Sequence, residues 1–413
     1  MALSTFVGSF TVPTVTGNKA TTGVGFAPKA MFFWGNRRAT DAATGSNTNN
    51  QDQPYYFGMA TVNASVVHQG VSPIGDDFVS TQVETITTAC ILDWNHTPTT
   101  NYQADFISMD ADGFTVHFST ANATAYVINF LALGGSDMEN AIVLSQTSPA
   151  GTGNQATTGA GFVPTAIIFV TGVTASSSLA ASAFVGAASA TTQRWMTAWD
   201  FSSTSNCYQR TVKVVGRWNG ASIGAEADLV SFDADGFTLN WSTAATGSTI
   251  LALCLRGGQY RAGTITQKTS SGTQATAGVG FKPTGLMFAT FGYAAQSTVH
   301  TTAPSRQMVG AVSDTTHRAV VYLGDGSFGV TDLDRTKCYT IQSDAASPTT
   351  TAAADLNQAF DADGFTLNYT TADATSREIL YLAFGSNNDV PPSPSLVMDP
   401  SNLFPGPPIW LGM

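Results

Sequence analysis

The chain carries little charge for its length. Of its 413 residues, only 11% are Asp, Glu, Lys or Arg, less than half of the roughly 25% found in an average soluble protein. This shortage excludes a coiled coil or a helical bundle, which need Glu, Lys, Leu and Arg in quantity. It also excludes charge-driven disorder, which combines high charge density with few aromatic residues, whereas 10% of the residues here are aromatic.

Basic residues are less frequent than acidic residues. The sequence contains 17 Lys and Arg against 28 Asp and Glu, for a formal net charge of −11. Such a chain repels phosphate backbones and anionic lipids, so we expect neither nucleic acid nor a membrane surface as a partner. No run reaches the ~18 apolar residues of a spanning helix, and the first residues, MALSTFVGSFTVP, lack the basic and apolar regions of a signal peptide.

What the sequence does contain is repetition, because two motifs occur three times each. The first reads GNKATTGVGFAPKAMFFWG from Gly17, GNQATTGAGFVPTAIIFVTG from Gly153 and GTQATAGVGFKPTGLMFATFG from Gly272. The second reads FISMDADGFTVHFST from Phe106, LVSFDADGFTLNWST from Leu229 and NQAFDADGFTLNYTT from Asn357. Each repeat spans about 120–135 residues, which is the size of a domain and too long for a solenoid or propeller unit.

The repeats predict three domains, residues 1–136, 137–258 and 259–389, followed by a Pro-rich tail, residues 390–413. The spacing between the motifs varies in the middle of each repeat, which indicates loops of different length. The three domains could pack as a body with approximate threefold symmetry or as a linear rod.

The repeats are typical of β-structure. Phe237, Leu239 and Trp241 alternate with polar residues, which indicates a strand with one buried face. The runs AMFFW, AIIFV and LMFA are apolar throughout, as expected for central strands covered on both faces. The predicted fold class is therefore all-β: three tandem homologous antiparallel β-sandwich domains, jelly-roll-like, plus an extended Pro-rich C-terminal tail.

The cysteines fit this organisation. Cys90, Cys207 and Cys338 fall one in each repeat, and the segments CILDW, CYQRT and CYTIQ align them as equivalent; Cys254 is the fourth. One thiol per repeat cannot form a disulfide within it. We therefore expect free, buried cysteines and a reducing compartment.

The DADG segments are the first candidates for chemistry. Their carboxylate pairs resemble the opening of a calcium loop, but no bidentate Glu follows at position 12. We interpret them as tight hairpin turns, in which the Asp side chains bond nearby backbone N–H groups and Gly takes φ > 0; a cation site is the alternative. The pairs are Asp110 and Asp112, Asp233 and Asp235, and Asp361 and Asp363.

Three other patterns lack their structural context. In GVGFAP and its copies, Pro28, Pro164 and Pro283 stand at the third glycine of a dinucleotide fingerprint, so we predict turns that lead into strands. The segment from Gly220 to Gly224 matches the nucleophile elbow G-x-S-x-G, but no strand–helix unit surrounds it. The five histidines, His68, His96, His117, His300 and His317, show no zinc-ligand spacing. We therefore predict no catalytic residue, no cofactor and no metal.

The C-terminal residues differ in composition from the rest of the chain. Residues 391–413 read PPSPSLVMDPSNLFPGPPIWLGM and contain seven of the 17 prolines, which predicts an extended segment with polyproline II character. We predict that its apolar residues dock into a neighbour, within or between chains, with a free tail as the alternative. These partner-docking residues are Leu403, Phe404, Ile409, Trp410 and Leu411.

The two motifs together carry a resemblance. The segment TTGVGFAPKAMFFWGNRR followed by a DADGFT hairpin resembles repeated β-sandwich domains in structural proteins of tailed bacteriophage virions, of the capsid decoration or tail appendage type. The resemblance covers residues 6–385 in three copies and excludes the tail. It implies a non-enzymatic virion protein that acts in particle assembly or surface attachment and is assembled in the host bacterial cytoplasm. The partners expected are other virion proteins, through the C-terminal tail, and host surface glycans.

Two other classes of function remain open. A carbohydrate-binding module or adhesin would expose aromatic side chains in the variable loops, with Tyr55, Tyr56, Trp94, Trp195 and Trp199 as candidates. A glycan-cleaving enzyme would need two facing carboxylates about 5–10 Å apart, and the shared Asp pairs are better explained as turns.

Overall fold

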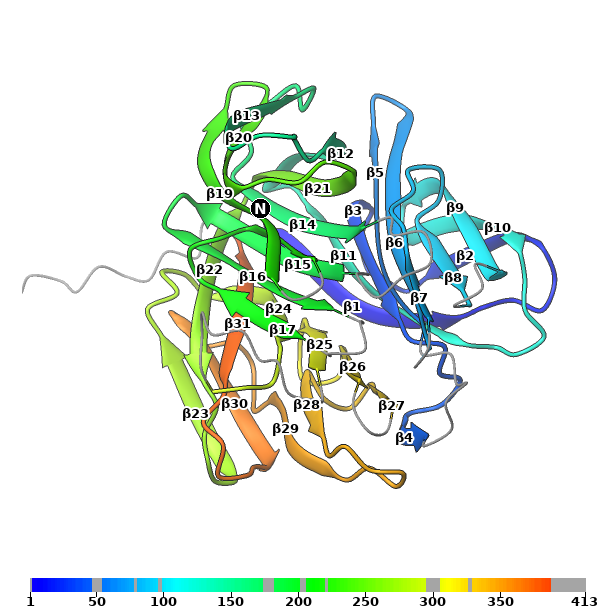
Figure 1. Ribbon diagram of the computed structural model, residues 1–413, viewed down its shortest axis with the longest axis vertical. Coiled ribbons are helices and arrows are strands. Elements are labelled where there is room, and N and C mark those ends of the chain that lie inside the picture. The colour runs from blue at the N-terminus through cyan, green and yellow to red at the C-terminus, as the bar shows by residue number, and fades with distance from the viewer. Residues whose placement is uncertain are drawn as a thin grey trace, which may run out of the picture.

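The structure, a computed structural model, consists of strands and their connections over the residues that it describes (Figure 1). These residues are 2–46, 54–77, 80–95, 99–173, 182–200, 206–219, 222–294, 305–325 and 329–387. No helix occurs among them, so the predicted all-β fold class is confirmed. The predicted docking residues of the tail, Leu403 to Leu411, lie outside the described part of the chain.

The strands form three pairs of antiparallel sheets, and each pair combines a larger sheet with a four-stranded one. The first larger sheet has the order β1 (Leu3–Thr11), β11 (Val127–Gly135), β3 (Pro28–Gly35), β5 (Tyr55–Asn63), β6 (Val66–Asp77) and β7 (Ser80–Val83). Its four-stranded partner has the order β2 (Gly17–Thr22), β10 (Gly113–Thr120), β9 (Thr100–Asp110) and β8 (Ile91–Trp94).

The second and third pairs repeat this order. The second larger sheet runs β12 (Met138–Thr147), β21 (Ser248–Gly257), β14 (Ala166–Val173), β15 (Ser182–Ala190), β16 (Gln193–Asp200) and β17 (Cys207–Arg210), and its partner runs β13 (Gly153–Thr158), β20 (Gly236–Thr243), β19 (Ser222–Asp233) and β18 (Val215–Asn219). The third larger sheet runs β22 (Gln259–Thr266), β31 (Glu378–Gly385), β24 (Pro283–Thr290), β25 (Ser305–Val312), β26 (Arg318–Asp325), β27 (Gly329–Asp334) and β4 (Ala42–Ser46), and its partner runs β23 (Gly272–Ala277), β30 (Gly364–Thr371), β29 (Thr350–Leu356) and β28 (Tyr339–Gln342).

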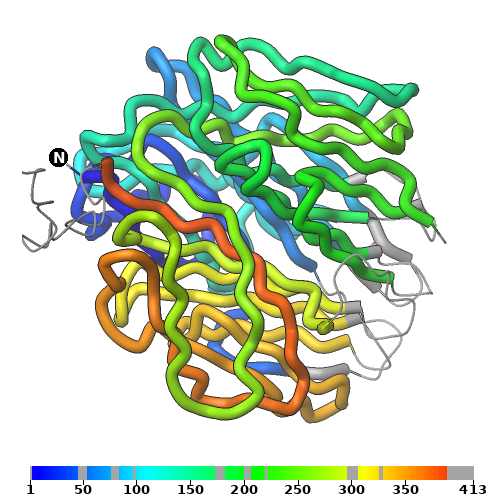
Figure 2. Tube along the Cα trace, turned by 90° about the vertical axis from the view of Figure 1, so that its left-hand side faces the viewer, coloured from blue at the N-terminus to red at the C-terminus, as the bar shows by residue number. Residues whose placement is uncertain are grey.

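We call these three sheet pairs units I, II and III. Unit I contains β1 to β11 without β4, unit II contains β12 to β21, and unit III contains β22 to β31. Figures 1 and 2 show the three units packed side by side in one body, not spaced along a line. Within a unit the connections differ in length between equivalent strands: residues 36–54 separate β3 from β5, 174–181 separate β14 from β15, and 291–304 separate β24 from β25.

The apolar runs of the first motif contribute side chains to two hydrophobic cores. Along β3, Met31 and Phe33 join the cluster between the two sheets of unit I, whereas Phe32 and Trp34 join a different cluster. This division follows from the strand period of two, since successive side chains leave opposite faces of a sheet. Ile167 to Val170 and Leu286 to Ala289 divide in the same way. Both faces of these central strands are buried, as the apolar runs predict.

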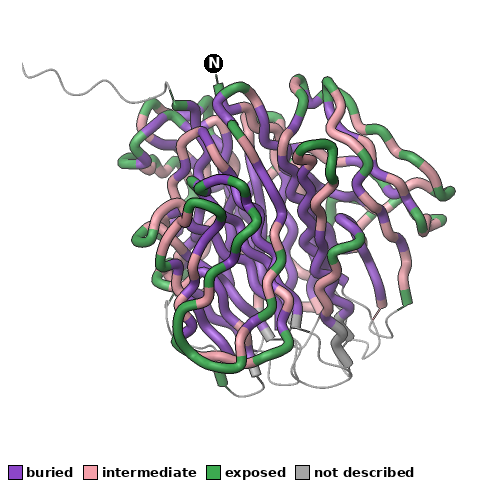
Figure 3. Tube along the Cα trace, turned by 90° about the horizontal axis from the view of Figure 1, so that it is seen from above, coloured by how far each residue is buried: buried purple, intermediate pink, exposed green. Residues whose placement is uncertain are grey.

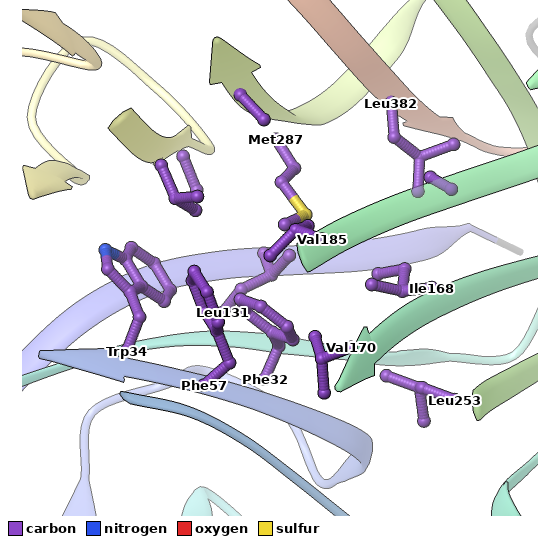
Figure 4. Packing of buried hydrophobic residues seen from close by; sticks show 14 of the residues in the cluster. Phe32, Trp34, Phe57, Leu131, Ile168, Val170, Val185, Leu253, Met287 and Leu382 are labelled. Atoms are coloured by element: carbon purple, nitrogen blue, oxygen red, sulfur yellow. The ribbon is translucent and has the colours of Figure 1, made fainter. Parts of the chain in front are cut away.

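The second cluster is a central core shared by all three units. Among the described residues it contains 42 buried ones, most of them on strands of the three larger sheets. Figure 4 shows its members pointing toward one another: Phe32, Trp34, Phe57 and Leu131 from unit I, Ile168, Val170, Val185 and Leu253 from unit II, and Met287 and Leu382 from unit III. The buried stretches accordingly run through the middle of the body, and the exposed ones lie at its margin (Figure 3).

The contacts between units close into a ring. The first strand of each larger sheet packs against a hairpin of another unit: β12 against β5 and β6, β22 against β15 and β16, and β1 against β25 and β26. The N-terminal and C-terminal parts of the chain therefore meet, and the arrangement is a closed body, one of the two packings that the sequence left open.

One strand crosses from unit I to unit III. β4 pairs with β27 over five residues, from Leu333 with Ala42 to Gly329 with Ser46, as the seventh strand of that sheet. Asn36 Nδ2 donates to the Asp332 carbonyl at 2.8 Å, and Arg335 Nε bonds Asp41 Oδ1 at 2.8 Å. This strand covers the edge of the third larger sheet, which would otherwise offer unpaired backbone groups.

Candidate functional site

The DADG segments form hairpin turns, as predicted. Their glycines, Gly113, Gly236 and Gly364, have φ of 148°, 144° and 153°. The first Asp of each turn accepts a hydrogen bond from a Thr of the following strand; in unit II, Thr238 Oγ1 donates to Asp233 Oδ2 at 2.6 Å.

The second Asp of each turn has a role that sequence reasoning missed. The carboxylate of Asp235 accepts the backbone N–H groups of Gly161 at 2.6 Å and Gly159 at 3.0 Å. Asp112 binds Gly25 and Gly23, and Asp363 binds Gly280 and Gly278, in the same geometry. The backbone N–H partners are thus supplied by the other motif, not by nearby residues as predicted. The two motifs recur together because one carboxylate holds the glycine loop of the other.

These bonds occupy the carboxylates that a cation would need. The N–H donors of Gly161 and Gly159 lower the pKa of Asp235 below its ordinary value. Among the described residues, no group of three or more His, Cys, Asp or Glu side chains is arranged to hold a metal ion. The hydrogen bonds of the turns thus give both carboxylates of each pair a structural role.

The aromatic residues considered for sugar stacking are buried. Tyr55, Tyr56 and Trp195 are 0% exposed, Trp199 is 1% exposed and Trp94 is 8% exposed. Tyr55, Trp195 and Trp199 belong to the central core, and Tyr56 and Trp94 belong to the core of unit I. These five side chains are not available at the surface, so their proposed part in carbohydrate binding was wrong.

The four cysteines are free and buried, as predicted. Their proposed equivalence was wrong for Cys207, which lies in β17 at the edge of a larger sheet. Cys90 and Cys338 directly precede β8 and β28, the edge strands of their four-stranded sheets, and their carbonyls face Gly58 and Gly310. The same position in unit II is Val214, which precedes β18 and faces Gly186. Burial raises the pKa of the Cys207 and Cys338 thiols to about 12, so neither is a reactive thiolate.

The remaining sequence candidates also find structural explanations or lie outside the described residues. Ser222, the central residue of the G-x-S-x-G match, opens β19 and pairs with Asn219 in a β-hairpin, not in a strand–helix turn. His117 Nδ1 lies 2.8 Å from Asn18 Oδ1 at the surface. His96 and His300 fall outside the described part of the chain.

A hydroxyl group repeats at each contact between units. The Val143 N–H donates to Thr61 Oγ1 at 3.2 Å, the Ala262 N–H to Ser189 Oγ at 2.9 Å, and the Val7 N–H to Ser313 Oγ at 3.0 Å. Each acceptor lies three residues after the glycine that faces Cys90, Val214 or Cys338. These bonds define equivalent positions in the three units and identify three equivalent contacts between them.

The cleft between units II and III contains a cavity of about 440 Å³, within the range of 300–1,000 Å³ typical of small-ligand sites. Unit II contributes Thr165, Ser189, Gln193 and Phe232 to its walls, and unit III contributes Tyr260, Arg261 and Phe281 among others. Arg261 is the one charged residue among the described residues that line it. No signal in the sequence marked this cavity, since its walls come from segments that only the packing of units brings together.

The equivalent cleft between units III and I holds a smaller cavity, of about 280 Å³. Its wall includes His317, whose Nδ1 lies 2.7 Å from Asp314 Oδ2 and whose ring packs on Phe6 with centroids 4.5 Å apart. Partial burial alone would raise the pKa of Asp314, but hydrogen bonds from Thr316 and His317 outweigh it and lower the pKa to about 2. His317 and Arg335 of this wall are thus paired with carboxylates, and Arg318 is bonded to backbone carbonyls.

No protein-family model matches the chain, and no curated protein matches it. Within the described ranges, the structure contains no helix with the length and apolarity that a membrane crossing requires.

Proposed function

We propose that the three units are tandem homologous antiparallel β-sandwich domains, jelly-roll-like, with boundaries at 1–136, 137–258 and 259–389. The support is the identical strand order of the three sheet pairs and the repeated motifs at equivalent places in each. β4 is the exception, since it leaves its own repeat to join the sheet of the third.

The chain then acts as a non-enzymatic structural protein of a tailed bacteriophage virion, as a capsid decoration, a spike or a tail appendage, in assembly or surface attachment. The observation that carries this proposal is the closed ring of three units around one central core. One chain thereby presents three equivalent units around a common centre and can fill a threefold position in a larger assembly. The resemblance of the motifs to virion β-sandwich proteins supports the same reading.

The tail supplies the attachment in this proposal. Residues 390–413 are rich in Pro and carry Leu403, Phe404, Ile409, Trp410 and Leu411, which would dock into another virion protein as an extended peptide. The last described residues leave the body where the units join: Ser386 Oγ accepts the Leu3 N–H at 2.9 Å, and Asn387 N–H donates to Asp137 Oδ2 at 2.9 Å.

Two experiments test the proposal. Electron microscopy of the particle that contains this chain should show three-lobed density at a threefold or pseudo-threefold position. If the chain is not found in any virus particle, the virion role is contradicted. Deletion of residues 390–413 should abolish incorporation while leaving the melting temperature of the body unchanged, and replacing Leu403, Phe404, Ile409, Trp410 and Leu411 by Ser in the full-length chain should reproduce the loss. Unchanged incorporation would exclude tail docking without excluding the virion role.

A further inference from the structure

The contact between units II and III differs from the other two in the hydrogen bonds that join the units. In the cleft between units I and II, Lys29 Nζ donates to the Met138 carbonyl, and in the cleft between units III and I, Thr5 Oγ1 donates to the Thr284 carbonyl. Thr165 occupies the position of Lys29 and Thr284 in the first motif. Its hydroxyl bonds a carbonyl of its own unit, as that of Thr284 does, but among the described residues Thr165 makes no hydrogen bond to unit III. The 440 Å³ cavity lies where this bridge between units would be.

Three side chains that line the cavity are specific to this contact between units. Val7, Val143 and Ala262 are equivalent, because the N–H of each donates to the repeated hydroxyl of a neighbouring unit. Two residues earlier, Tyr260 therefore corresponds to Thr5 and Ala141. One residue earlier, Arg261 corresponds to Phe6 and Ile142. Gln193 stands where the other units have His68 and His317. Because the fold forms the same strands and hairpins without them, Tyr260, Arg261 and Gln193 are not required by the architecture.

Two of these groups lack the partners that burial demands. Tyr260 is only 9% exposed, and its hydroxyl has no hydrogen-bond partner among the described residues. The hydroxyl lies beside Gly258, another residue of the cavity wall, at 3.5 Å from the position that a Cβ there would take. Arg261 Nε is likewise buried without a partner in the described part of the chain, whereas the rest of its guanidinium bonds the Tyr381 side chain. A buried polar group without a partner is costly, and these two atoms differ from other such atoms of the structure in belonging to residues of a cavity wall, where a polar ligand would supply the partners.

We propose that this cavity binds a saccharide that carries a carboxylate. Phe232 offers an apolar face for the C–H side of a sugar ring. The amide N–H groups of Gln193, the amide oxygen of Gln259 and the Tyr260 hydroxyl offer donors and acceptors for ring hydroxyls. Arg261 recognises the carboxylate, because a guanidinium binds planar anions with two parallel hydrogen bonds. The described residues of the wall include no acidic residue, so no negative charge of the wall opposes the carboxylate there. A saccharide site would serve the surface attachment proposed above, but its binding test does not depend on the virion role.

Binding is tested on the full-length chain with defined probes. Oligogalacturonates, alginate oligosaccharides and hyaluronate oligosaccharides serve as acidic probes, and cello-, malto- and xylo-oligosaccharides serve as neutral ones. Calorimetry and saturation-transfer NMR are carried out on the wild type, Arg261→Gln and Gln193→Ala. Arg256→Gln is the matched control for charge, because Arg256 pairs with Glu139 outside the cavity; His317→Ala is the control for the equivalent position in the other cleft.

The proposal predicts saturable binding of at least one acidic probe, weakened at least tenfold by Arg261→Gln and by Gln193→Ala and unchanged by both controls. Binding of none of the acidic probes would overturn it, as would binding that Arg261→Gln leaves intact. A synthetic peptide of residues 390–413 is measured in parallel. If the peptide binds in an Arg261-dependent manner and no saccharide binds, the cavity is a site for the chain's own tail and the saccharide proposal is wrong.

Discussion

The indole Nε1 of Trp195 donates a 2.7 Å hydrogen bond to the carbonyl oxygen of Tyr381. The two residues belong to different units and are 186 positions apart in the chain. Trp195 is fully buried in the central core, so its one polar atom is satisfied by the backbone of a neighbouring unit. The interior of the molecule is thus built from interactions between units as much as from interactions within them.

The repeated hydroxyls provide a first test of these contacts. Ser189→Ala, Ser313→Ala and Thr61→Val each leave a backbone N–H of another unit without its acceptor, and we expect each to lower the free energy of unfolding by about 1–3 kcal/mol. Chemical denaturation measures the change. The matched exchanges Ser189→Thr, Ser313→Thr and Thr61→Ser retain the hydroxyl and should restore most of the loss; equal losses in both series would show that the hydrogen bonds do not stabilise the ring.

Glycine is required where the large sheets approach the four-stranded ones. A Cβ at Gly310 would lie 2.1 Å from the carbonyl oxygen of Cys338, and a Cβ at Gly58 would lie 1.7 Å from that of Cys90. Backbone must shift to admit either, so we expect Gly310→Ala to destabilise the protein by about 1–3 kcal/mol or more. Gly151→Ala is the control, since nothing lies within 4 Å of its Cβ position. Similar melting temperatures for both variants would contradict the packing described.

The lowered pKa of Asp235 predicts that this carboxylate contributes to unfolding in acid. The N–H groups of Gly161 and Gly159 lower its pKa, so the ionised form is favoured in the folded state. The resulting stability is present above the ordinary carboxyl pKa of about 4 and is lost as pH falls through the lower folded pKa. Asp235→Asn should therefore destabilise at pH 7 and show a smaller loss of melting temperature between pH 5 and pH 2 than the wild type. A parallel acid dependence in both proteins would contradict this role.

The raised pKa of Asp332 predicts that its contribution to stability changes with pH in the opposite direction. Burial, assisted by the nearby negative charge of Asp334, raises its pKa to about 6, although Gln342, Thr340 and Arg38 favour the ionised form. The folded state therefore holds the proton more tightly than the unfolded state, whose pKa is about 4. The free energy of unfolding falls as pH rises between these two values.

Asp332→Asn removes this titration while its side-chain oxygen can still accept from Gln342 Nε2, which lies 2.6 Å from Asp332 Oδ2. The variant should gain stability relative to the wild type from pH 4 to pH 7, by about 2 kcal/mol in total. A stability difference that does not change over this range would contradict the raised pKa.

Much of the local structure follows from the sequence. The period of two in the second motif predicts β10, β20 and β30, with Phe114, Phe237 and Phe365 buried. The positive φ of Gly113 and its equivalents follows from the DADG turn. These features depend on neighbouring residues, and three copies of each pattern reinforce the prediction.

The interactions between distant segments could not be read in the same way. The apolar run at Phe32 and Trp34 indicates a strand buried on both faces, but not that the second face packs against other units. Cys207 falls at the expected spacing, yet Val214 occupies the equivalent site, because the connections within unit II differ in length. The cavity around Tyr260 arises only where two units meet, and no local pattern encodes such a meeting.

Calorimetric unfolding tests most directly whether the three units form one cooperative body around the central core. Met287→Ala removes a side chain that lies in that core and not in the core of its own unit, at an expected cost of about 2–5 kcal/mol. The account predicts one transition in the wild type, with equal calorimetric and van't Hoff enthalpies, and one transition in the variant, displaced as a whole to lower temperature. Separate transitions, with only that of unit III displaced in the variant, would contradict it.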